Sequence, residues 1–261
     1  MKPRLVAVIT GASAGIGRAT ALRLAKGGAA VVICARRRER LEEVAAQAKE
    51  LGGDALPIVA DVTSQSQVEA VVAAAMERFG RLDVMMCNAG FGIYGRIGEI
   101  PPDRVRRLLD VNVMGTYHGI HAALPIFREQ QSGHFIIISS IVGRRGVPFT
   151  GAYAATKFAQ VGMTEALRAE LHGTNIHATV VYPVSTNTEF FAVMTAESGF
   201  AARAAGPRQT AEQVADAIAR AIEKPVPEVY PYPRARALAI LSVVAPGYTD
   251  RLVQRWRRGP D

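Results

Sequence analysis

The sequence predicts an α/β fold in which a single doubly wound parallel sheet carries helices on both faces. Short apolar runs alternate with longer amphipathic segments along most of the 261 residues. Strands buried on both faces of a parallel sheet have such unbroken apolar sequences, and their alternation with helices is typical of this architecture. Hydrophobic residues make up 49% of the chain, which is ample for a buried core.

The first half of the chain divides into strands and the helices between them. The apolar runs predict strands at Leu5–Ile9, Ala30–Ala35, Leu56–Ala60 and Leu82–Cys87. Helical spacing predicts helices at Ile16–Lys26, Glu39–Leu51 and Gln65–Phe79. Each of these helices is followed by glycine, which is a stop signal.

The second half continues the alternation with longer helices. A helical segment covers about residues 103–128, and further helices are expected at Tyr153–Leu171 and from Thr210 to about Glu223. The remaining strands are expected at Phe135–Ile138, Ile176–Tyr182 and Val226–Tyr230. We therefore expect residues 1–233 to form the main domain and residues 234–261 a basic amphipathic extension packed on it.

Ligands of a doubly wound sheet bind at the carboxyl ends of the strands, so the residues after each strand are informative. The first strand leads into Thr10-Gly-Ala-Ser-Ala-Gly-Ile-Gly17, a glycine-rich turn that opens a helix. Glycines let the backbone approach a ligand closely, and the helix amino terminus offers free N–H groups to a pyrophosphate. A tight turn without a ligand is the alternative, because the spacing of Gly11 and Gly15 departs from G-x-G-x-x-G.

The same turn also matches G-x-S-x-G, the nucleophile elbow of α/β-hydrolases. A hydrolase would need an acid and then a histidine after later strands. None of the histidines stands after a predicted strand late in the chain, so the sequence disfavours this alternative.

The second strand ends at Ala35 and is followed by Arg36 and Arg37. An NAD site would place an acid here, about 20 residues past the glycines, to bind the ribose hydroxyls. Arginines would instead attract the 2′-phosphate of NADP(H). A solvated first turn of a helix is the alternative interpretation for each arginine.

The later strands are also followed by polar residues and their neighbours. These are Asp61 and Val62, Asn88, Ala89 and Gly90, Ser139 and Ser140, and Pro183. In the helix after the fifth strand, Tyr153 and Lys157 lie four positions apart and therefore share one face.

Taken together, these segments resemble the short-chain dehydrogenase/reductase family. The resemblance spans roughly residues 4–233 and rests on the turn from Thr10 to Gly17, Asp61-Val62, Asn88-Ala89-Gly90, Asn112, Ser140 and Tyr153-x-x-x-Lys157. It implies a Rossmann-like fold, an NADP(H)-dependent oxidoreductase acting on a carbonyl or secondary alcohol, and a homodimer or homotetramer. The family often has Pro-Gly-x-Val-x-Thr after the sixth strand; Val184 and Thr186 depart from that pattern, whereas Thr188 keeps its place.

The resemblance implies a catalytic set of Asn112, Ser140, Tyr153 and Lys157. Tyr153 is expected to exchange a proton with the substrate oxygen, Ser140 to hold that oxygen, and Asn112 to hold a water that connects Lys157 to solvent. A free tyrosine has a pKa near ~10. An ammonium at ~5 Å contributes roughly 3 kcal/mol at an effective dielectric constant of ~20, which predicts a pKa for Tyr153 lowered by about 2.

The resemblance also implies which residues hold NADP(H). Asp61 is expected to face the adenine, Asn88 the ribose region and Thr188 the nicotinamide carboxamide, while Lys157 also binds the ribose hydroxyls. The full expected set is Gly11, Ser13, Gly15, Ile16, Gly17, Ala35, Arg36, Arg37, Asp61, Val62, Asn88, Ala89, Gly90, Tyr153, Lys157, Pro183 and Thr188.

The substrate contacts are expected to come from the loops after the strands. The candidates are Ser140, Tyr94, Val142, Val184, Phe190 and Phe191, with Ile93, Val147 and Phe149 as further lining. These side chains, with an apolar lid at about residues 188–206, favour an apolar ketone, aldehyde or secondary alcohol. Arg144 and Arg145 keep an acidic 3-oxoacyl-carrier substrate open. A non-catalytic dinucleotide-binding regulator is a further alternative, although such relatives typically lose the tyrosine, lysine or serine.

The net charge of +8 comes from 26 Arg and 5 Lys and is concentrated at residues 36–40 and 234–258. A nucleic-acid surface would normally be broader, so no nucleic-acid partner is expected. Cys34 and Cys87 fall in apolar runs, which indicates free thiols in a reducing cytoplasm. His118 and His121 have no evident third ligand, so no metal is expected.

The extension combines an apolar-leaning run at residues 237–245 with six arginines and one acid, Asp250, between residues 234 and 258. The run is too short to span a bilayer. Three interpretations are open: a helix pair packed on the protein's own core, a cap on the substrate mouth of its own or a partner subunit, or a contact with an anionic membrane surface.

Overall fold

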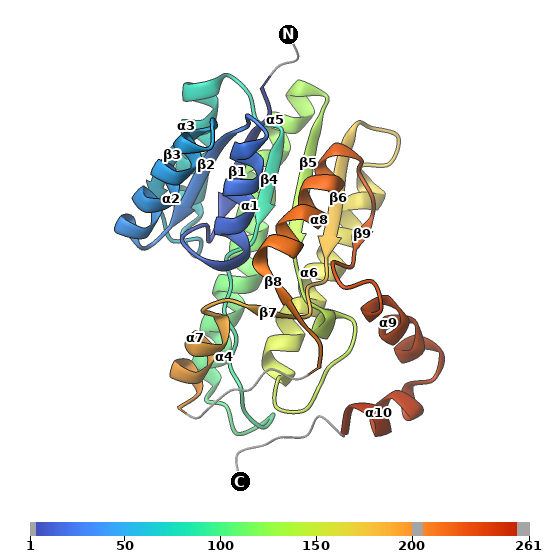
Figure 1. Ribbon diagram of the computed structural model, residues 1–261. Helices are drawn as coiled ribbons and strands as arrows, with labels where there is room; N and C mark the ends of the chain where they lie inside the picture. The colour runs from blue at the N-terminus through green and yellow to red at the C-terminus, as the bar shows by residue number, and fades with distance from the viewer. Residues whose placement is uncertain (1–3, 200–205, 255–261) are drawn as a thin grey trace.

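The computed structural model describes residues 4–199 and 206–254 of the chain. Its main feature is a seven-stranded parallel sheet with the strand order β3-β2-β1-β4-β5-β6-β9 (Figure 1). The strands are β1 (Val6–Thr10), β2 (Ala30–Ala35), β3 (Asp54–Val59), β4 (Val84–Cys87), β5 (Gly133–Ile138), β6 (Ile176–Val181) and β9 (Glu228–Val229). The predicted doubly wound parallel sheet is confirmed.

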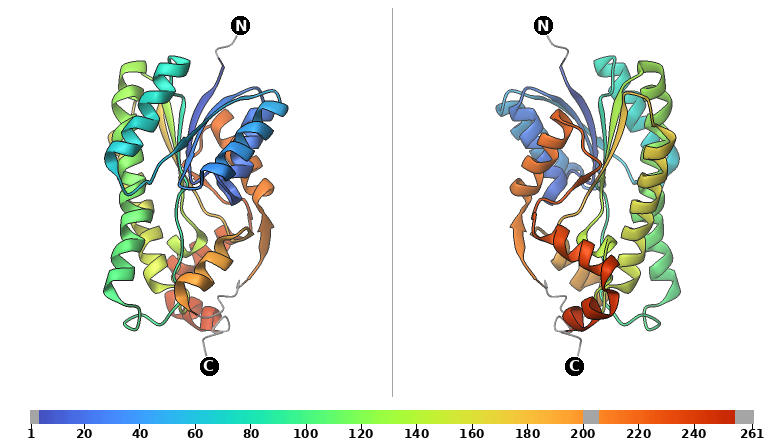
Figure 2. Two further views of the ribbon diagram at one scale, coloured as in Figure 1. Left: turned by 90° about the vertical axis from the view of Figure 1, so that its left-hand side faces the viewer. Right: turned by 90° about the vertical axis from the view of Figure 1, so that its right-hand side faces the viewer.

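Helices cover both faces of this sheet, as the views along it in Figure 2 show. One face carries α1 (Gly15–Lys26), α2 (Arg38–Glu50) and α8 (Ala211–Glu223), and the other carries α3 (Gln65–Phe79), α5 (Gly115–Gln130) and α6 (Gly151–Glu170). Successive strand residues point to opposite faces. Ile9 therefore joins the core on the α1 side, whereas Val8 joins the core on the α3 side.

The helix expected over about residues 103–128 is continuous but not uniform. It consists of α4 (Pro102–Leu109), a π-helical turn at Asp110–Met114, and α5. Such turns occur often at functional sites. This one contains Asn112, whose side chain is fully buried.

The order of the strands reverses beside β1. The chain runs outward from β1 to β2 and β3, then returns to place β4 on the other side of β1. The connections that leave β1 and β4 thus diverge to opposite faces, which opens a ligand-binding crevice at the carboxyl ends of these strands. The glycine-rich turn after β1 and the Asn88 segment after β4 both lie there.

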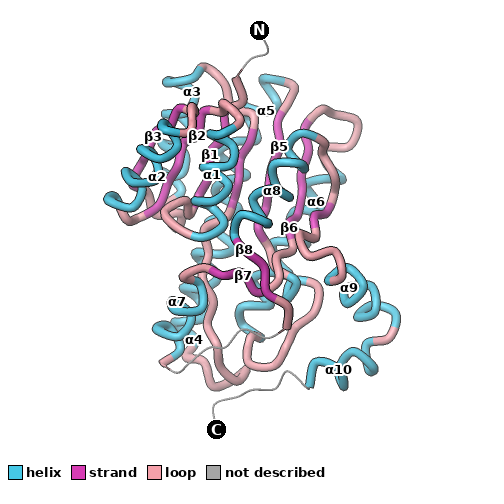
Figure 3. The backbone as a smooth tube through the Cα atoms, in the orientation of Figure 1, coloured by secondary structure: helices cyan, strands magenta, loops and turns pink. Residues whose placement is uncertain are grey.

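Several elements near the carboxyl edge were not individually predicted. β7 (Ser185–Asn187) pairs in parallel with β8 (Arg208–Thr210), and α7 (Phe190–Ser198) follows β7 (Figure 3). The chain continues after β9 with α9 (Ala235–Val244) and α10 (Pro246–Gln254). Part of the expected lid, residues 200–205, lies outside the described residues, as do Arg255, Arg257 and Arg258 of the extension.

Two further features concern the cysteines and the length of the helices. Cys34 and Cys87 are buried free thiols in β2 and β4, as expected. Within residues 4–199 and 206–254, no helix combines the length and the apolar composition that crossing a membrane requires.

Two glycines allow a test of the packing with substitutions of opposite effect. A β-carbon on Gly133, at the start of β5, would overlap the ring of the fully buried Phe127. Gly133→Ala should therefore lower the free energy of unfolding by about 1–3 kcal/mol. Gly162 lies in α6 with nothing within 4 Å of such a carbon. Gly162→Ala should raise the free energy of unfolding by about 1 kcal/mol.

Urea unfolding followed by far-ultraviolet circular dichroism measures both changes. Displacements of the two midpoints in the same direction would contradict this description of the core between β5 and α5.

Candidate active site

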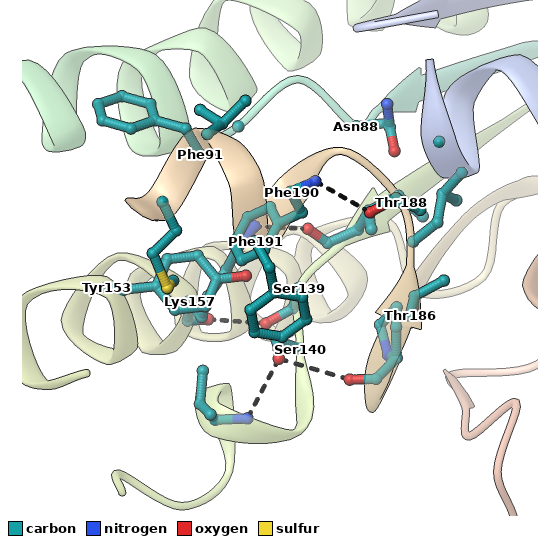
Figure 4. A pocket seen from close by; sticks show the side chains of 18 of the residues that line it. Asn88, Phe91, Ser139, Ser140, Tyr153, Lys157, Thr186, Thr188, Phe190 and Phe191 are labelled. Carbon is teal, nitrogen blue, oxygen red and sulfur yellow. Dashed lines mark hydrogen bonds between the residues drawn. The ribbon is translucent and has the colours of Figure 1, made fainter. Parts of the chain in front are cut away.

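A cavity of about 780 Å³ lies at the carboxyl edge of the sheet. Its walls come from the turns after β1, β2, β3, β4, β5 and β6, and from α4, α6, α7 and the carboxyl-terminal helices. Figure 4 shows Tyr153, Lys157 and Ser140 close together, with Phe190 and Phe191 of α7 beside them and Asn88 and Thr188 farther off. The cavity therefore joins the expected dinucleotide side to the expected substrate side.

The glycine-rich turn is pressed against the segment that follows β4. Gly11 has a φ of +65°, and a β-carbon there would lie 2.8 Å from Cα of Ala89. Asn88 holds the turn by donating from Nδ2 to the carbonyl oxygens of Thr10 at 2.8 Å and Gly11 at 3.1 Å. The side-chain amide of Asn88, which was expected to face the ribose region of the cofactor, thus holds the glycine-rich turn in shape. Gly17 does not line the cavity; it packs beneath the turn, where a β-carbon would lie 2.6 Å from Asn88 Nδ2.

The amino terminus of α1 faces this cavity without a side-chain cap. Its N-cap residue, Ala14, accepts no hydrogen bond through its side chain, and the first turn contains no acidic residue. Free N–H groups and the positive end of the helix dipole therefore meet the cavity, an arrangement that suits an anionic pyrophosphate. Gly15 and Thr188 approach each other closely at this part of the cavity, since a β-carbon on Gly15 would lie 3.1 Å from Cγ2 of Thr188. The residues present fit a dinucleotide.

The charged end of the cavity lies beyond β2, where Ala35, Arg36 and Arg37 contribute to the wall. The guanidinium of Arg37 donates to Ser13 Oγ at 3.1 Å and forms an ion pair with Glu189 at 2.9 Å. Both side chains of this pair are half exposed. Arg37 therefore links the glycine-rich turn to the start of α7 across the cavity mouth.

Tyr153 and Lys157 project from one face of α6, and both are buried. Lys157 Nζ lies 5.6 Å from the centre of the Tyr153 ring. Burial raises the pKa of Tyr153 above its ordinary value, and a hydrogen bond with Ser140 partly offsets that rise. The expectation that the neighbouring Lys157 lowers the pKa of Tyr153 by about 2 is therefore wrong, because burial of the phenol raises the pKa instead.

The ammonium of Lys157 is itself destabilised by burial, which lowers its pKa from 10.5 to about 7. Nζ donates to the carbonyl oxygen of Ile138 at 2.9 Å and to Gln160 Oε1 at 2.9 Å. Gln160 was not among the predicted site residues. Its place three residues after Lys157, on the buried face of the same helix, is the signal that could have identified it.

Asn112 lies behind the cavity rather than on its surface. Its Nδ2 donates to Phe91 O at 2.9 Å and to Thr156 Oγ1 at 3.0 Å. Its backbone carbonyl accepts from Gln160 Nε2 at 2.9 Å. Asn112 is thus connected to Lys157 through Gln160, and this contact uses its backbone rather than its side chain. The expected water between Asn112 and Lys157 stays a prediction.

The two serines after β5 have different environments. Ser139 is buried and donates from Oγ to the carbonyl oxygen of Lys157 at 3.0 Å, so it ties β5 to α6. Both serines border the cavity, but Ser140 is less buried, with Oγ 3.4 Å from the carbonyl oxygen of Pro183 and 3.4 Å from the amide of Val142. Ser140 is the serine placed to meet a ligand beside Tyr153.

The expected substrate residues separate into two groups. The cavity wall includes Ser140, Tyr94, Val142, Val147, Val184, Phe190 and Phe191. Ile93 and Phe149 do not line it and pack in the neighbouring apolar cluster instead.

Arg144 and Arg145 lie outside the cavity wall. Arg144 pairs with Glu165 and Glu228, and Arg145 pairs with Asp250. The alternative of an acidic substrate therefore gains no support from the positions of these two arginines.

Sequence reasoning missed several residues of the wall. Arg107 of α4 lines the cavity and forms a two-pronged ion pair with Glu197 of α7, at 3.0 and 2.9 Å. The extension contributes Arg234, Ala235, Leu238 and Leu252. Of the three interpretations of the extension, the cap on the substrate mouth of its own subunit agrees with this position.

The two helix histidines serve other contacts. Nδ1 of His118 lies 2.9 Å from the carbonyl oxygen of Val62, and His121 stacks on Tyr117. Among the residues that the structure describes, no three His, Cys, Asp or Glu side chains form a group that could hold a metal ion.

Comparison with known proteins places this geometry in a family. Residues 5–199 match the family model of short chain dehydrogenases. An uncharacterized oxidoreductase of Listeria monocytogenes is 38% identical over 225 residues, which are 84% of this chain and 91% of that protein.

Solved structures agree. A short chain dehydrogenase/reductase from Burkholderia phymatum in complex with NAD has a TM-score of 0.84 at 26% identity, covering 99% of this chain and 97% of that one. A 3-ketoacyl-ACP reductase from Sinorhizobium meliloti 1021 has a TM-score of 0.76 at 32% identity, covering 86% and 96%. The chain belongs to the short-chain dehydrogenase family of oxidoreductases.

Proposed function

We propose that this protein is an NADP(H)-dependent oxidoreductase that interconverts an apolar ketone or aldehyde and the corresponding alcohol. The observation that carries the proposal is the pairing of the Tyr153 and Ser140 hydroxyls beside apolar side chains of the cavity wall, among them Val142, Val184 and Phe190. Two adjacent hydroxyls suit a single substrate oxygen, and the apolar side chains around them suit a hydrocarbon body.

In the reductive direction the substrate carbonyl accepts a proton from Tyr153. The raised pKa of Tyr153 keeps its hydroxyl protonated at neutral pH, so it is ready to donate as negative charge develops on the oxygen. Ser140 donates a hydrogen bond to the same oxygen and holds it in place. Lys157, once charged, stabilises the tyrosinate that remains. When bound, the nicotinamide dinucleotide supplies the hydride.

Support for NADP(H) over NAD(H) comes from the charged end of the cavity. Ala35 leaves the end of β2 without a carboxylate, and Arg36 and Arg37 follow it. The ion pair of Arg37 with Glu189 is half exposed and therefore weak. A 2′-phosphate offers Arg37 a stronger, charge-assisted and two-pronged partner.

A 3-oxoacyl-carrier substrate is the second candidate, and the similarity to the Sinorhizobium meliloti reductase favours it. Because Arg144 and Arg145 are committed to ion pairs, an acidic carrier would have to engage other cations. A non-catalytic regulator is less well supported, since Ser140, Tyr153 and Lys157 are all present in one cavity.

We further propose a cytoplasmic homodimer or homotetramer. Exposed apolar side chains on α4, the π-helical turn, α5 and α6 support self-association; they are Leu109, Met114, Tyr117 and Phe158.

The first prediction concerns the proton donor. Tyr153→Phe should lower kcat by about 10²–10⁴-fold, because it removes the proton donor and leaves the cavity shape unchanged. NADPH binding should persist. Stopped-flow and steady-state assays of NADPH oxidation over a panel of ketones and aldehydes measure the effect. Tyr94→Phe, on a second tyrosine of the same cavity, is the control and should keep most of the turnover. Retention of more than about a tenth of kcat in Tyr153→Phe would refute the assignment.

The second prediction concerns the choice of cofactor. NADPH should be preferred over NADH by more than about tenfold in kcat/KM, since a charge-assisted contact contributes ~1.5–3 kcal/mol. Arg37→Ala should remove most of that preference, and Ala35→Asp should move it toward NADH. Arg40→Ala is the control, because Arg40 pairs with Glu43 and does not line the cavity.

Glu189 provides an independent check on this arrangement. Glu189→Gln frees Arg37 from its carboxylate partner, so the Kd for NADPH should fall while the Kd for NADH stays unchanged. Equal efficiency with the two cofactors in the wild type would sink the proposed preference.

The third prediction concerns the protonation of Lys157. With a pKa of about 7, Lys157 is mostly neutral in the free protein at pH 8. The negative charge of NADPH favours the ammonium, so binding at pH 8 should take up close to one proton. Titration calorimetry in buffers of different ionisation enthalpy measures this uptake. At pH 6 the amine is already charged and uptake should nearly vanish. Uptake that is the same at both pH values, or that persists in Lys157→Met, would contradict the assignment.

A further inference from the structure

The helix pair α9–α10 carries a large exposed apolar surface. The exposed fractions are 57% for Ile240, 80% for Val243, 77% for Val244 and 61% for Tyr248. Within α9, Ile240, Val243 and Val244 stand at helical spacing and therefore share one face. We call these four residues the outer patch.

The opposite face of the same helices belongs to the cavity and the core. Ala235, Ala239 and Ser242 of α9 are buried, and Leu238 and Leu252 line the cavity. The apolar residues of the outer patch are therefore additional to those that fix α9 and α10 on the protein. A surface of this kind indicates a contact with something outside the subunit.

Two arginines of α9 and α10 accompany the outer patch. Arg236 and Arg251 are exposed, and neither forms an ion pair among the residues that the structure describes. The one acid of these helices, Asp250, pairs with Arg145. Arg236 lies one helical turn before Ile240, so charge and apolar side chains occupy one outward face.

The helix pair α9–α10 lies at the same end of the molecule as the cavity. α9 follows β9 and lies beyond the carboxyl edge of the sheet, at the end of the molecule where the cavity is found (Figures 1 and 2). The ends of α2 and α5 at Leu51 and Arg128 lie at the opposite, amino edge, because each of these helices returns the chain to the start of a strand.

We propose that α9 and α10 dock the protein on an anionic lipid surface, with the outer patch in the acyl boundary and Arg236 and Arg251 at the headgroups. Apolar side chains flanked by arginines have the composition of interfacial helices. Neither helix is long enough to span a bilayer, so both lie on it. A second copy of this chain fits less well, since a two-fold contact would bring like charges from both copies together.

Docking in this orientation also bears on the substrate class, a step that rests on the proposed function. Leu238 and Leu252 belong both to the cavity wall and to the helices that touch the lipid, so a substrate that enters beside them comes from the membrane side. A lipid-soluble carbonyl compound or alcohol is then the class of substrate that the cavity receives.

Vesicle flotation tests the docking without any substrate. The full-length protein is mixed with vesicles of 70% phosphatidylcholine and 30% phosphatidylserine, or of phosphatidylcholine alone, in ~50 mM and ~500 mM salt. We expect flotation with the anionic vesicles at low salt and a marked loss at high salt, since an arginine near such a surface strengthens binding about fivefold.

Matched variants separate the contributions. The double variant Val243→Asp/Val244→Asp should lower the partition coefficient more than about tenfold, because it places charge in the acyl boundary. Arg236→Glu/Arg251→Glu should do so mainly at low salt. Leu51→Asp and Arg128→Glu, exposed positions at the opposite edge, should float like the wild type.

Several outcomes would overturn the docking. One is absence of flotation of the wild type with anionic vesicles, and another is equal flotation of the wild type and the Val243/Val244 variant. A third is a wild type that does not bind vesicles but whose oligomer size, measured by sedimentation velocity, differs from that of the variant. This third result would assign the outer patch to a contact with a second copy of the chain. NADPH binding by all variants reports on the proposed function separately, because none of the substituted residues lines the cavity.

Discussion

The burial of the Lys157 ammonium is the constraint on which the site depends. A charge withdrawn from water is unfavourable unless polar groups surround it, and here the pKa falls to about 7 even with two acceptors at 2.9 Å. One acceptor is the last carbonyl of β5, which fixes α6 against the sheet. The other is Gln160, which is held in turn by Asn112 and Thr116 of the long α4–α5 helix. The π-helical turn brings Asn112 into that position. The polar interior of this region is therefore organised around one lysine, and an anionic dinucleotide is the ligand that would restore its charge.

The framework could be predicted from the sequence because it depends on local patterns. Unbroken apolar runs identify strands buried on both faces, and the glycines after the early helices mark their ends, as at Gly80, where φ is +71°. The residues after the strands gather at one edge because all strands are parallel. That one geometrical fact brings the glycine-rich turn, Asn88, Ser140 and Pro183 into a common cavity.

What could not be predicted depends on contacts between distant segments. β7 and β8 are three residues each and exist only because they pair across the segment that contains α7. Thr186, which departs from the family pattern, is buried there and accepts a hydrogen bond from Gln209. The pKa of Tyr153 was misjudged for a related reason. The spacing of Tyr153 and Lys157 gives their separation, but it does not give the depth of burial that decides which effect prevails.

The helix α7 connects the two halves of the cavity, and its ends are held unequally. At its start, Glu189 makes one half-exposed ion pair with Arg37 on the dinucleotide side. At its other end Glu197 receives two hydrogen bonds from Arg107, its carbonyl accepts from Arg104 at 2.7 Å, and the Ser198 hydroxyl accepts from the Tyr94 amide at 2.8 Å. Several hydrogen bonds in one region resist displacement better than one exposed pair. The weakest of these contacts is thus the ion pair of Glu189 with Arg37, which lies at the end of the cavity where a 2′-phosphate would bind. Phe190 and Phe191 lie near the start of α7 and line the cavity, so the same short helix contributes to the wall on the expected dinucleotide side and on the expected substrate side.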